Sequence, residues 1–296
     1  MTAMLRLTVL AGLLWPIAAA AQVQSPAQSP VQMPVQIPVP AEAPILVPNA
    51  AEDCDVPAYL LSTESALTKV GAAIKDRNKL NILVVGSRSS SLQASAGQPL
   101  AKSITNNPTA INGPADAAYP SRLQQMLSQK LPSLAISVSV DLQPRKTAEE
   151  VAASLATLVA ARKPDLVVWQ TGTVDAMRGI DLDDFRSAMD DGVKALQAAG
   201  SDVILMNLQY SPRTETMTSP TPYVDNMRVV AQDHDVPVFD RFAIMRHWHE
   251  DGDFDLFNPS PGIDLAKKVH ECLARALATF VIDAAHVNST ELKTQR

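Results

Sequence analysis

The stretch Asn81–Ser90, Asn-Ile-Leu-Val-Val-Gly-Ser-Arg-Ser-Ser, decides the fold. Its first half is a short apolar run rich in valine and isoleucine, which is typical of a strand that is buried on both faces. Gly86 and the serines around Arg88 then end the apolar pattern, as a turn at the end of a strand does. Ligands of parallel α/β sheets bind outside the carboxyl ends of the strands, so Gly86, Ser87 and Arg88 are candidate site residues.

Further runs of the same kind follow along the chain, separated by helical patterns. The strand-like runs are Ile82–Val85, Ala135–Val140, Leu166–Gln170, Val203–Asn207 and Val236–Phe239. The helical stretches are Tyr119–Lys130, Thr147–Arg162, Leu182–Ala199, Pro222–Asp233 and Asp264–Ala284. This alternation predicts an α/β fold with a parallel five-stranded sheet and helices on both faces. A site is then expected in the loops that follow the strands.

The two ends of the chain differ from this core in composition. Residues 1–21 resemble a signal peptide, with a charged start at Arg6, an apolar run too short to span a bilayer, and a small-residue cleavage site. Residues 22–51 form a proline-rich linker that favours extended polyproline II, either as a plain stalk or as a ligand for an envelope protein. Residues 52–285 are the folded domain and residues 286–296 a polar tail. We therefore expect a secreted or periplasmic protein.

The charge balance and the hydropathy restrict the partners. The net charge is −6 for the whole chain, and loss of Arg6 with the leader makes the mature chain more negative still. This balance argues against nucleic acid or an anionic membrane as the main partner. No segment after the leader is apolar enough for a transmembrane helix. We expect no cofactor.

Two cysteines occur in the chain, Cys54 at the start of the domain and Cys272 near its end. In an oxidising compartment such a pair usually forms a disulfide. Two buried free thiols are the alternative. We expect the disulfide.

Three further stretches carry a resemblance to a known family. Ala118–Leu123 (AYPSRL), Pro164–Thr173 (PDLVVWQTGT) and Arg241–Trp248 (RFAIMRHW) resemble landmarks of a proteobacterial, exported branch of the SGNH (GDSL-like) hydrolases. The resemblance implies a three-layer α/β/α flavodoxin-like sandwich. In active members a serine attacks an ester, a histidine oriented by an aspartate takes its proton, and a serine amide, a glycine amide and an asparagine side chain bind the oxyanion.

Other residues occupy the positions that match the catalytic ones. The nucleophile position holds Arg88, and the oxyanion glycine is replaced by Arg145. The third block, Gly-x-Asn-Asp in the family, reads Gly-Thr-Val-Asp here, so Val174 replaces the asparagine and Asp175 follows it. Arginine cannot be deprotonated in a protein and valine has no donor, so the usual mechanism is lost.

The fourth block, Asp-x-x-His in the family, can be placed in two ways. Alignment on the stretch that begins at Cys272 puts the aspartate at Pro261 and the histidine at Asp264. Alignment on the stretch that begins at Asp255 puts Asn258 where the histidine belongs. Neither placement supplies a general base.

These replacements predict a catalytically inactive pseudoenzyme that binds an anionic ligand or an envelope partner. Arg88 and Arg145 follow neighbouring strands, so we expect their guanidinium groups to converge beside the amides of Gly86–Ser90. Such a pair suits a carboxylate, phosphate, sulfate or acidic saccharide. In the alternative arrangement both arginines point to solvent or pair with Asp175 or Asp264. Asp175 is also expected to accept hydrogen bonds from buried backbone groups.

An active site made of other residues is the competing hypothesis. Ser89 lies beside the lost nucleophile, and His247 lies on a segment expected to be a loop, so the two are candidates for a rearranged carboxylic-ester hydrolase. Serines in such a turn are more commonly helix caps. His247 and His249 would also share one face of an extended segment with carboxylates beside them, which suggests a metal site. The nearby cation Arg246 and a flexible glycine argue against it, and we expect no metal.

Overall fold

The computed structural model describes residues 54–92, 117–257 and 262–286, which all lie in the second of the chain's two units, Pro48–Arg296. The expected signal peptide and proline-rich linker lie outside the described residues, as do nearly all of the polar tail and the two positions Asn258 and Pro261 of the fourth block.

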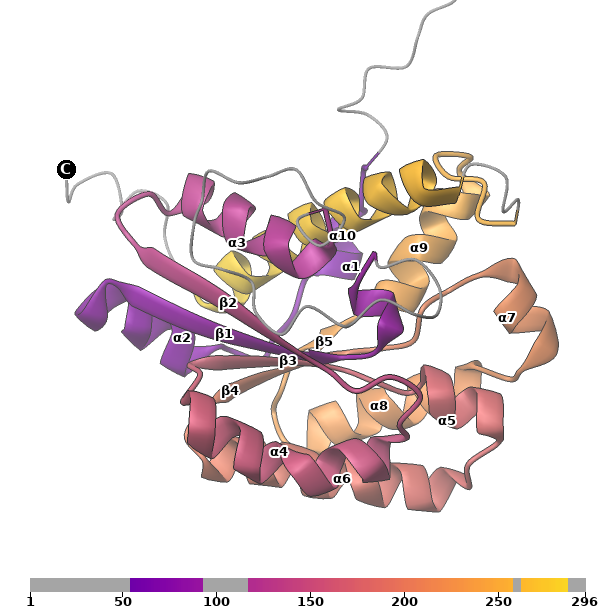
Figure 1. Cartoon of the computed structure of the whole chain (residues 1–296), viewed down its shortest axis with the longest axis horizontal. Coiled ribbons are helices and arrows are strands. Elements are labelled where there is room, and N and C mark those ends of the chain that lie inside the picture. Colours follow the sequence, from indigo (N-terminus) through magenta and orange to yellow (C-terminus); the bar gives the residue numbers. More distant parts are fainter. Residues whose placement is uncertain (1–53, 93–116, 258–261, 287–296) are drawn as a thin grey trace, which may run out of the picture. The chain divides into compact units, whose positions relative to one another are not determined.

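A parallel sheet forms the centre of the domain (Figure 1). Its strands are β1 (Lys79–Gly86), β2 (Ala135–Leu142), β3 (Leu166–Gln170), β4 (Asp202–Met206) and β5 (Val238–Phe239). They lie in the order β2-β1-β3-β4-β5, and each neighbouring pair is parallel. This is the flavodoxin-like order, in which the chain changes direction between β1 and β3. The predicted fold class is confirmed.

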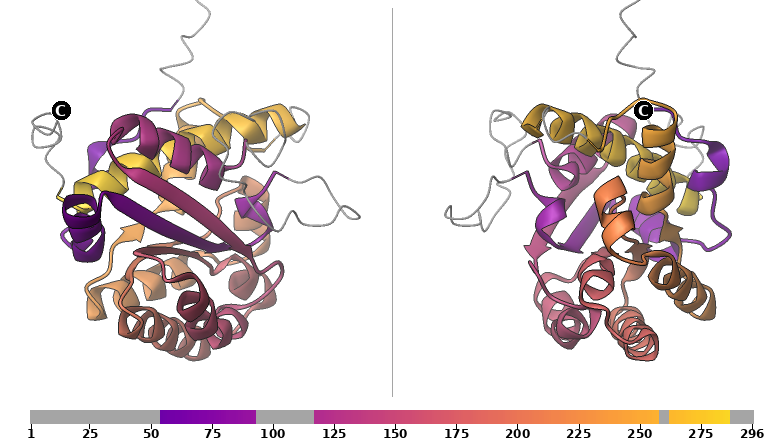
Figure 2. Two further views of the ribbon diagram at one scale, coloured as in Figure 1. Left: turned by 60° about the vertical axis from the view of Figure 1, so that its left-hand side comes forward. Right: turned by 90° about the vertical axis from the view of Figure 1, so that its right-hand side faces the viewer.

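Helices cover both faces of the sheet (Figures 1 and 2). One face carries α3 (Tyr119–Lys130) and α10 (Gly262–Ala284), which pack on each other, and the other carries α4 (Ala148–Arg162), α6 (Leu182–Ala198) and α8 (Thr221–Asp233). The shorter helices are α1 (Ala58–Leu61), α2 (Thr68–Ala72) with a π-helical turn (Ala73–Arg77), a 3-10 turn (Arg88–Ser90), α5 (Thr173–Arg178), α7 (Pro212–Met217) and α9 (Arg241–Glu250). None of the helices described is both long enough and apolar enough to cross a membrane.

The central strands are buried because helices cover them on both sides. All five residues of β3 are buried, and Trp169 fills the space beneath α6. Gly192 of α6 makes room for that ring, since a Cβ atom there would lie 2.3 Å from the Trp169 side chain. The close approach of α6 to the sheet therefore depends on this glycine.

The structure differs from the sequence-based expectation after the last strand. The segment that carries His247 is not a loop, because Arg241–Glu250 forms helix α9. Phe242, Met245 and Trp248 are buried at a spacing of three residues, which is a helical pattern that we did not recognise.

The suggested metal site required an extended segment, and this segment is a helix instead. His247 and His249 are two positions apart on α9. Their side chains are therefore about 200° apart around the helix axis rather than on one face. The prediction that they share one face is wrong.

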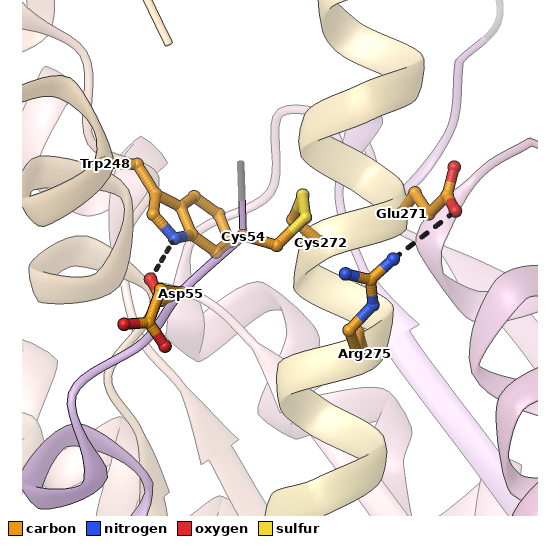
Figure 3. Close-up of a disulfide and its surroundings, with 6 residues drawn as sticks. All are labelled: Cys54, Asp55, Trp248, Glu271, Cys272 and Arg275. Atoms are coloured by element: carbon orange, nitrogen blue, oxygen red, sulfur yellow. Dashed lines mark hydrogen bonds and ion pairs between the residues drawn. A yellow bond between two sulfur atoms is a disulfide. The ribbon is translucent and has the colours of Figure 1, made fainter. Parts of the chain in front are cut away.

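A disulfide joins the start of the domain to its last helix, as predicted (Figure 3). Cys54 precedes α1, Cys272 lies in α10, and their Cα atoms are 5.3 Å apart. Beside the bridge, the indole N–H of Trp248 donates to the carbonyl oxygen of Asp55 at 2.9 Å. The N-terminal segment is thus held against both α9 and α10.

Reduction of the bridge should destabilise the domain. The cysteines are 218 positions apart, and a cross-link over such a distance contributes about 3–5 kcal/mol in the chain-entropy account. Urea unfolding with and without a reductant measures the difference. A Cys54→Ser/Cys272→Ser variant is the control, because its stability should not respond to reductant. Equal stability of the oxidised and reduced wild-type protein would contradict the prediction.

Candidate functional site

The candidate site lies at the carboxyl edge of the sheet, beside the strands β1 and β3 where the chain changes direction. Val85 is paired with Trp169, so the loop that begins at Gly86 lies next to the end of β3. Gly86 allows this loop to fold back tightly, since a Cβ atom there would lie 2.1 Å from Ser90 Oγ. Any larger residue at this position would displace the Ser90 side chain.

The amide of Gln170, the last residue of β3, organises this loop. Its oxygen accepts hydrogen bonds from Ser90 Oγ at 2.7 Å and from the Tyr119 hydroxyl at 3.1 Å. Its nitrogen donates to Ser89 Oγ at 2.7 Å and to Ser87 Oγ at 3.3 Å. A primary amide offers two donors and two acceptor sites, so Gln170 uses its complete hydrogen-bonding capacity here.

The hydroxyl groups of this loop are therefore held by the amide of a buried residue. Gln170 is 5% exposed. The remaining contact of Ser87 Oγ is Ser89 Oγ, 3.2 Å away. No imidazole nitrogen of a described residue lies within hydrogen-bond distance of these serine hydroxyls, as a serine nucleophile would require.

A second group of hydrogen bonds places Arg241 at the first position of α9. The Asp240 carboxylate caps this helix by accepting from the amide of Ala243 at 2.9 Å. Asn207, which follows β4, donates to the same carboxylate at 2.7 Å and accepts from the amide of Phe242 at 2.8 Å. Arg228 pairs with the other oxygen of Asp240 at 2.7 Å. Both oxygens of Asp240 are thus engaged, and neither pairs with Arg241.

The guanidinium group of Arg241 is buried with almost no partner. The residue is 1% exposed, and its one hydrogen bond to a described residue runs from Nη1 to Ser89 Oγ at 3.4 Å. Nε and Nη2 are buried and have no hydrogen-bond partner among the described residues. Burial lowers the pKa of Arg241 to about 10, opposed by the charge interaction with Tyr119, so the group is cationic at neutral pH. An unpaired buried charge costs several kcal/mol.

His270, on α10, is neutral in the same cluster. Its Nδ1 accepts a hydrogen bond from the backbone amide of Tyr119 at 2.9 Å, which leaves the ring proton on Nε2. Burial, and then the charge of Arg241, lower the pKa of His270 to about 4. Burial raises the pKa of Tyr119 to about 12, against the Ser90 hydrogen bond and the charge of Arg241. Of these three groups only Arg241 is charged at neutral pH.

A cavity of about 230 Å³ lies between the end of the sheet, α9 and α10. Its polar lining includes Ser89, Gln209, Arg241 and His270. Its apolar lining includes Met245, Leu256, Leu265, Val269 and Leu273. A second hollow, lined by Gly86, Lys146 and Val174 among others, holds about 10 Å³, which is space for no more than a water molecule.

The structure places Arg88 and Arg145 at exposed positions. Arg88 is on the 3-10 turn after β1, and Arg145 lies after β2 with a positive φ of 64°. Neither lines the two cavities described above, and neither forms an ion pair with Asp175 or Asp264. The carbonyl oxygen of Arg145 accepts from Arg178 at 2.8 Å.

The two acidic candidates, Asp175 and Asp264, have structural contacts. Asp175 accepts from the amide of Ala148 at 2.9 Å, at the start of α4, which confirms the role expected for it. Burial raises the pKa of Asp175, and its backbone hydrogen bonds oppose the shift. Asp264 is exposed on the first turn of α10 and lies 3.2 Å from Lys267.

The structure does not bring the alternative catalytic pair together. Ser89 contacts Gln170 and Arg241, whereas Nδ1 of His247 lies 3.4 Å from the Asp251 carboxylate. His249 accepts through Nδ1 from the amide of Leu256 at 3.3 Å. Within the described ranges, no group of three or more histidine, cysteine, aspartate or glutamate side chains could hold a metal ion.

Sequence reasoning missed the four residues that form the buried cluster. These residues are Tyr119, Gln170, Arg241 and His270. A signal was present for two of them, because Gln170 is a polar residue that ends a buried strand and Arg241 follows another strand by two positions. Tyr119 lies in the landmark stretch Ala118–Leu123 but was expected only as part of a helix, and His270 likewise lies in an expected helix.

The comparisons with known proteins agree with this fold. A model of the non-GDSL lipase-like family matches residues 53–287. A catalytic mutant of Axe2, an acetylxylan esterase from Geobacillus stearothermophilus, is 17% identical, with 71% of this chain and 95% of that one covered and a TM-score of 0.52. LAE5, an alpha/beta hydrolase enzyme from the metagenome of Lake Arreo, Spain, is 18% identical over 70% and 95%, with a TM-score of 0.51. No curated protein matches the chain.

The buried neutral state of His270 should make stability depend on pH. Its pKa is about 4 in the folded protein against 6.5 for the ordinary group. Its stabilising contribution is complete above pH 6.5 and is lost as the pH falls through 4, because the unfolded chain takes up a proton first. Between pH 7.5 and 4.5 the loss should be about 2–3 kcal/mol.

An Asn at position 270 keeps a hydrogen-bond acceptor but cannot titrate in this range, so the His270→Asn variant should lose that much less stability than wild type on acidification. Urea unfolding at the two pH values measures the difference, and His247→Asn on the surface of α9 is the matched control. Identical pH dependence in wild type and His270→Asn would contradict the account.

Proposed function

The chain belongs to the non-GDSL lipase-like family, and from this premise we propose that it is an exported protein that has kept the SGNH hydrolase fold, does not hydrolyse esters, and binds an anionic ligand. The family and the fold set the expected place of the site, and the residues at that place decide its chemistry.

The observation that supports loss of hydrolysis is the state of the hydroxyl groups after β1. A serine nucleophile must give its proton to a base, but the serine hydroxyls here contact Gln170, Tyr119, Arg241 and one another. His270 lines the same cavity as Ser89, yet its Nδ1 is occupied by the Tyr119 amide, so Nε2 carries a proton and cannot accept one.

The groups that would stabilise an oxyanion are also replaced. Val174 occupies the position of the asparagine in the Gly-x-Asn-Asp block, and its side chain has no donor. Arg145 occupies the position of the oxyanion glycine and is exposed. Loss of one such donor alone typically costs about 10²–10³ in rate.

The observation that supports an anionic ligand is the unpaired cation Arg241. Arg241 borders the cavity and its buried guanidinium has no carboxylate partner among the described residues, so an anion held in the cavity would offset its charge. Arg88 and Arg145, which follow the ends of β1 and β2, are proposed as outer contacts for a ligand that extends beyond the cavity. The ligand site proposed here thus centres on Arg241 rather than on Arg88 and Arg145.

The sequence and the disulfide support the location. A signal-peptide pattern at residues 1–21 and a proline-rich segment at 22–51 suit a domain that is exported and carried on a stalk. The bridge between Cys54 and Cys272 suits an oxidising compartment. We propose a secreted or periplasmic location on these grounds.

The purified protein should hydrolyse p-nitrophenyl acetate and p-nitrophenyl octanoate no faster than a heat-denatured sample. Ser89→Ala should leave this background unchanged. Arg88→Ser alone should not create activity, because no imidazole nitrogen of a described residue lies within hydrogen-bond distance of the loop serines. Ser91→Ala, at a half-buried neighbouring position whose hydroxyl donates to the Arg88 carbonyl oxygen, is the matched control. Turnover that is lost in Ser89→Ala and kept in Ser91→Ala would refute the proposal and restore the rearranged hydrolase.

A further inference from the structure

Two successive residues of the N-terminal segment tie it to two different helices (Figure 3). Cys54 is bonded to Cys272 of α10. The carbonyl oxygen of Asp55 accepts a hydrogen bond from the indole N–H of Trp248, on α9, at 2.9 Å. The Cα atoms of successive residues are about 3.8 Å apart. One short stretch of backbone therefore limits the separation of these two points on α9 and α10.

The same two helices form the walls of the cavity described above. On α10, Cys272 lies between two lining residues, Val269 and Leu273. On α9, the lining residue Met245 lies about one helical turn before Trp248. The disulfide and the indole hydrogen bond thus act on the elements that carry the lining side chains.

Trp248 also holds a third part of the lining in place. Its carbonyl oxygen accepts from the amide of Phe254 at 3.1 Å, and the two rings meet edge to face with centroids 5.6 Å apart. Leu256, which follows Phe254 by two positions, lines the cavity, and its amide donates to Nδ1 of His249 on α9 at 3.3 Å. A displacement of Trp248 would therefore move Leu256 as well.

The described residues of α9 and α10 have few close backbone approaches to each other. α10 packs instead against α3 and α1, and the cavity of about 230 Å³ separates it from α9. A covalent link between the walls therefore acts where direct packing is sparse. With the link open, only non-covalent contacts connect the walls, and local opening of such a region needs less free energy than global unfolding.

We propose that the disulfide is a redox-dependent clamp on the cavity: oxidation fixes the separation of α9 and α10, and reduction releases both walls while the sheet stays folded. As the S–S bond forms, each cysteine thiol gives up one proton and one electron. A protein disulfide accepts both protons and both electrons by thiol–disulfide exchange and becomes two thiols. The walls are then fixed only in an oxidising compartment. The clamp is independent of the ligand that the cavity takes.

Hydrogen exchange of the full-length mature protein, measured by mass spectrometry before and after treatment with a phosphine reductant, tests the clamp. In native buffer the amides of residues 242–256 and 262–273 should exchange about tenfold faster after reduction, because local opening becomes easier. The amides of α4 and α6, on the other face of the sheet, should change by less than about twofold. The Cys54→Ser/Cys272→Ser variant should match the reduced protein with and without the reductant.

Reduction also lowers the overall stability, so a destabilised protein with an intact bridge is the control. Gly192→Ala places a Cβ atom against the Trp169 ring beneath α6, on the face of the sheet opposite α10. The oxidised Gly192→Ala protein and the reduced wild type are compared at urea concentrations that give them the same unfolding free energy. Only the reduced wild type should show accelerated exchange in the walls.

Trp248→Phe tests the other end of the clamp, because it keeps a ring beside Phe254 and removes the N–H donor to Asp55. In the oxidised protein this change should accelerate exchange of the wall amides by about threefold or more. The two links act in series through the same segment. Reduction of Trp248→Phe should therefore give wall exchange within about twofold of that in reduced wild type.

Equal wall exchange in oxidised and reduced protein overturns the inference, as does an acceleration on the far face equal to that in the walls. Effects of reduction and of Trp248→Phe that multiply in full also overturn it, because links in series cannot act independently. The comparison of wild type with Trp248→Phe stays decisive if the double serine variant does not fold.

Discussion

The four hydrogen bonds of the Gln170 amide are the constraint on which the site depends. This side chain ends the buried central strand β3 and connects it to three serines of the loop after β1 and to the first residue of α3. Because the amide has no spare donor or acceptor, the loop has one arrangement that satisfies every group. The hydroxyl groups of the loop are hydrogen-bonded to this amide and to one another, and Nδ1 of the nearby His270 accepts from the Tyr119 amide.

The hydrogen bonds of Gln170 are all satisfied, whereas those of Arg241 are not, so the burial of Arg241 costs stability. Its neighbours satisfy one another: Asp240 is engaged by Asn207, Arg228 and the start of α9, and His270 by the Tyr119 amide. The guanidinium is left buried with one long hydrogen bond, at a cost that a hydrophobic residue of similar size would avoid. We propose that an anionic ligand offsets this cost.

The sequence predicted most of the fold and little of the site. Strands such as Leu166–Gln170 are buried on both faces and are recognised by composition alone. The disulfide was predicted because the chain has only two cysteines. Helix α9 was missed although Phe242, Met245 and Trp248 have helical spacing, because charged residues and histidines among them suggested a loop. The site was missed because its contacts join distant positions: Arg241 and Ser89 are 152 residues apart, and His270 and Tyr119 are 151 apart. Alignment of the family motif on Gly86 instead predicted a site at Arg88 and Arg145, whose side chains are exposed.

The central proposal is that Arg241 is kept for a ligand and not for stability, and the unfolding free energy of the ligand-free Arg241→Met variant tests it most directly. Methionine has a similar length and needs no counter-ion, so the account predicts a variant that is more stable than wild type by about 1–4 kcal/mol in urea unfolding. Arg246→Met on the exposed side of α9 should differ little from wild type. An Arg241→Met variant less stable than wild type would show that the guanidinium stabilises the fold itself, and would contradict the account.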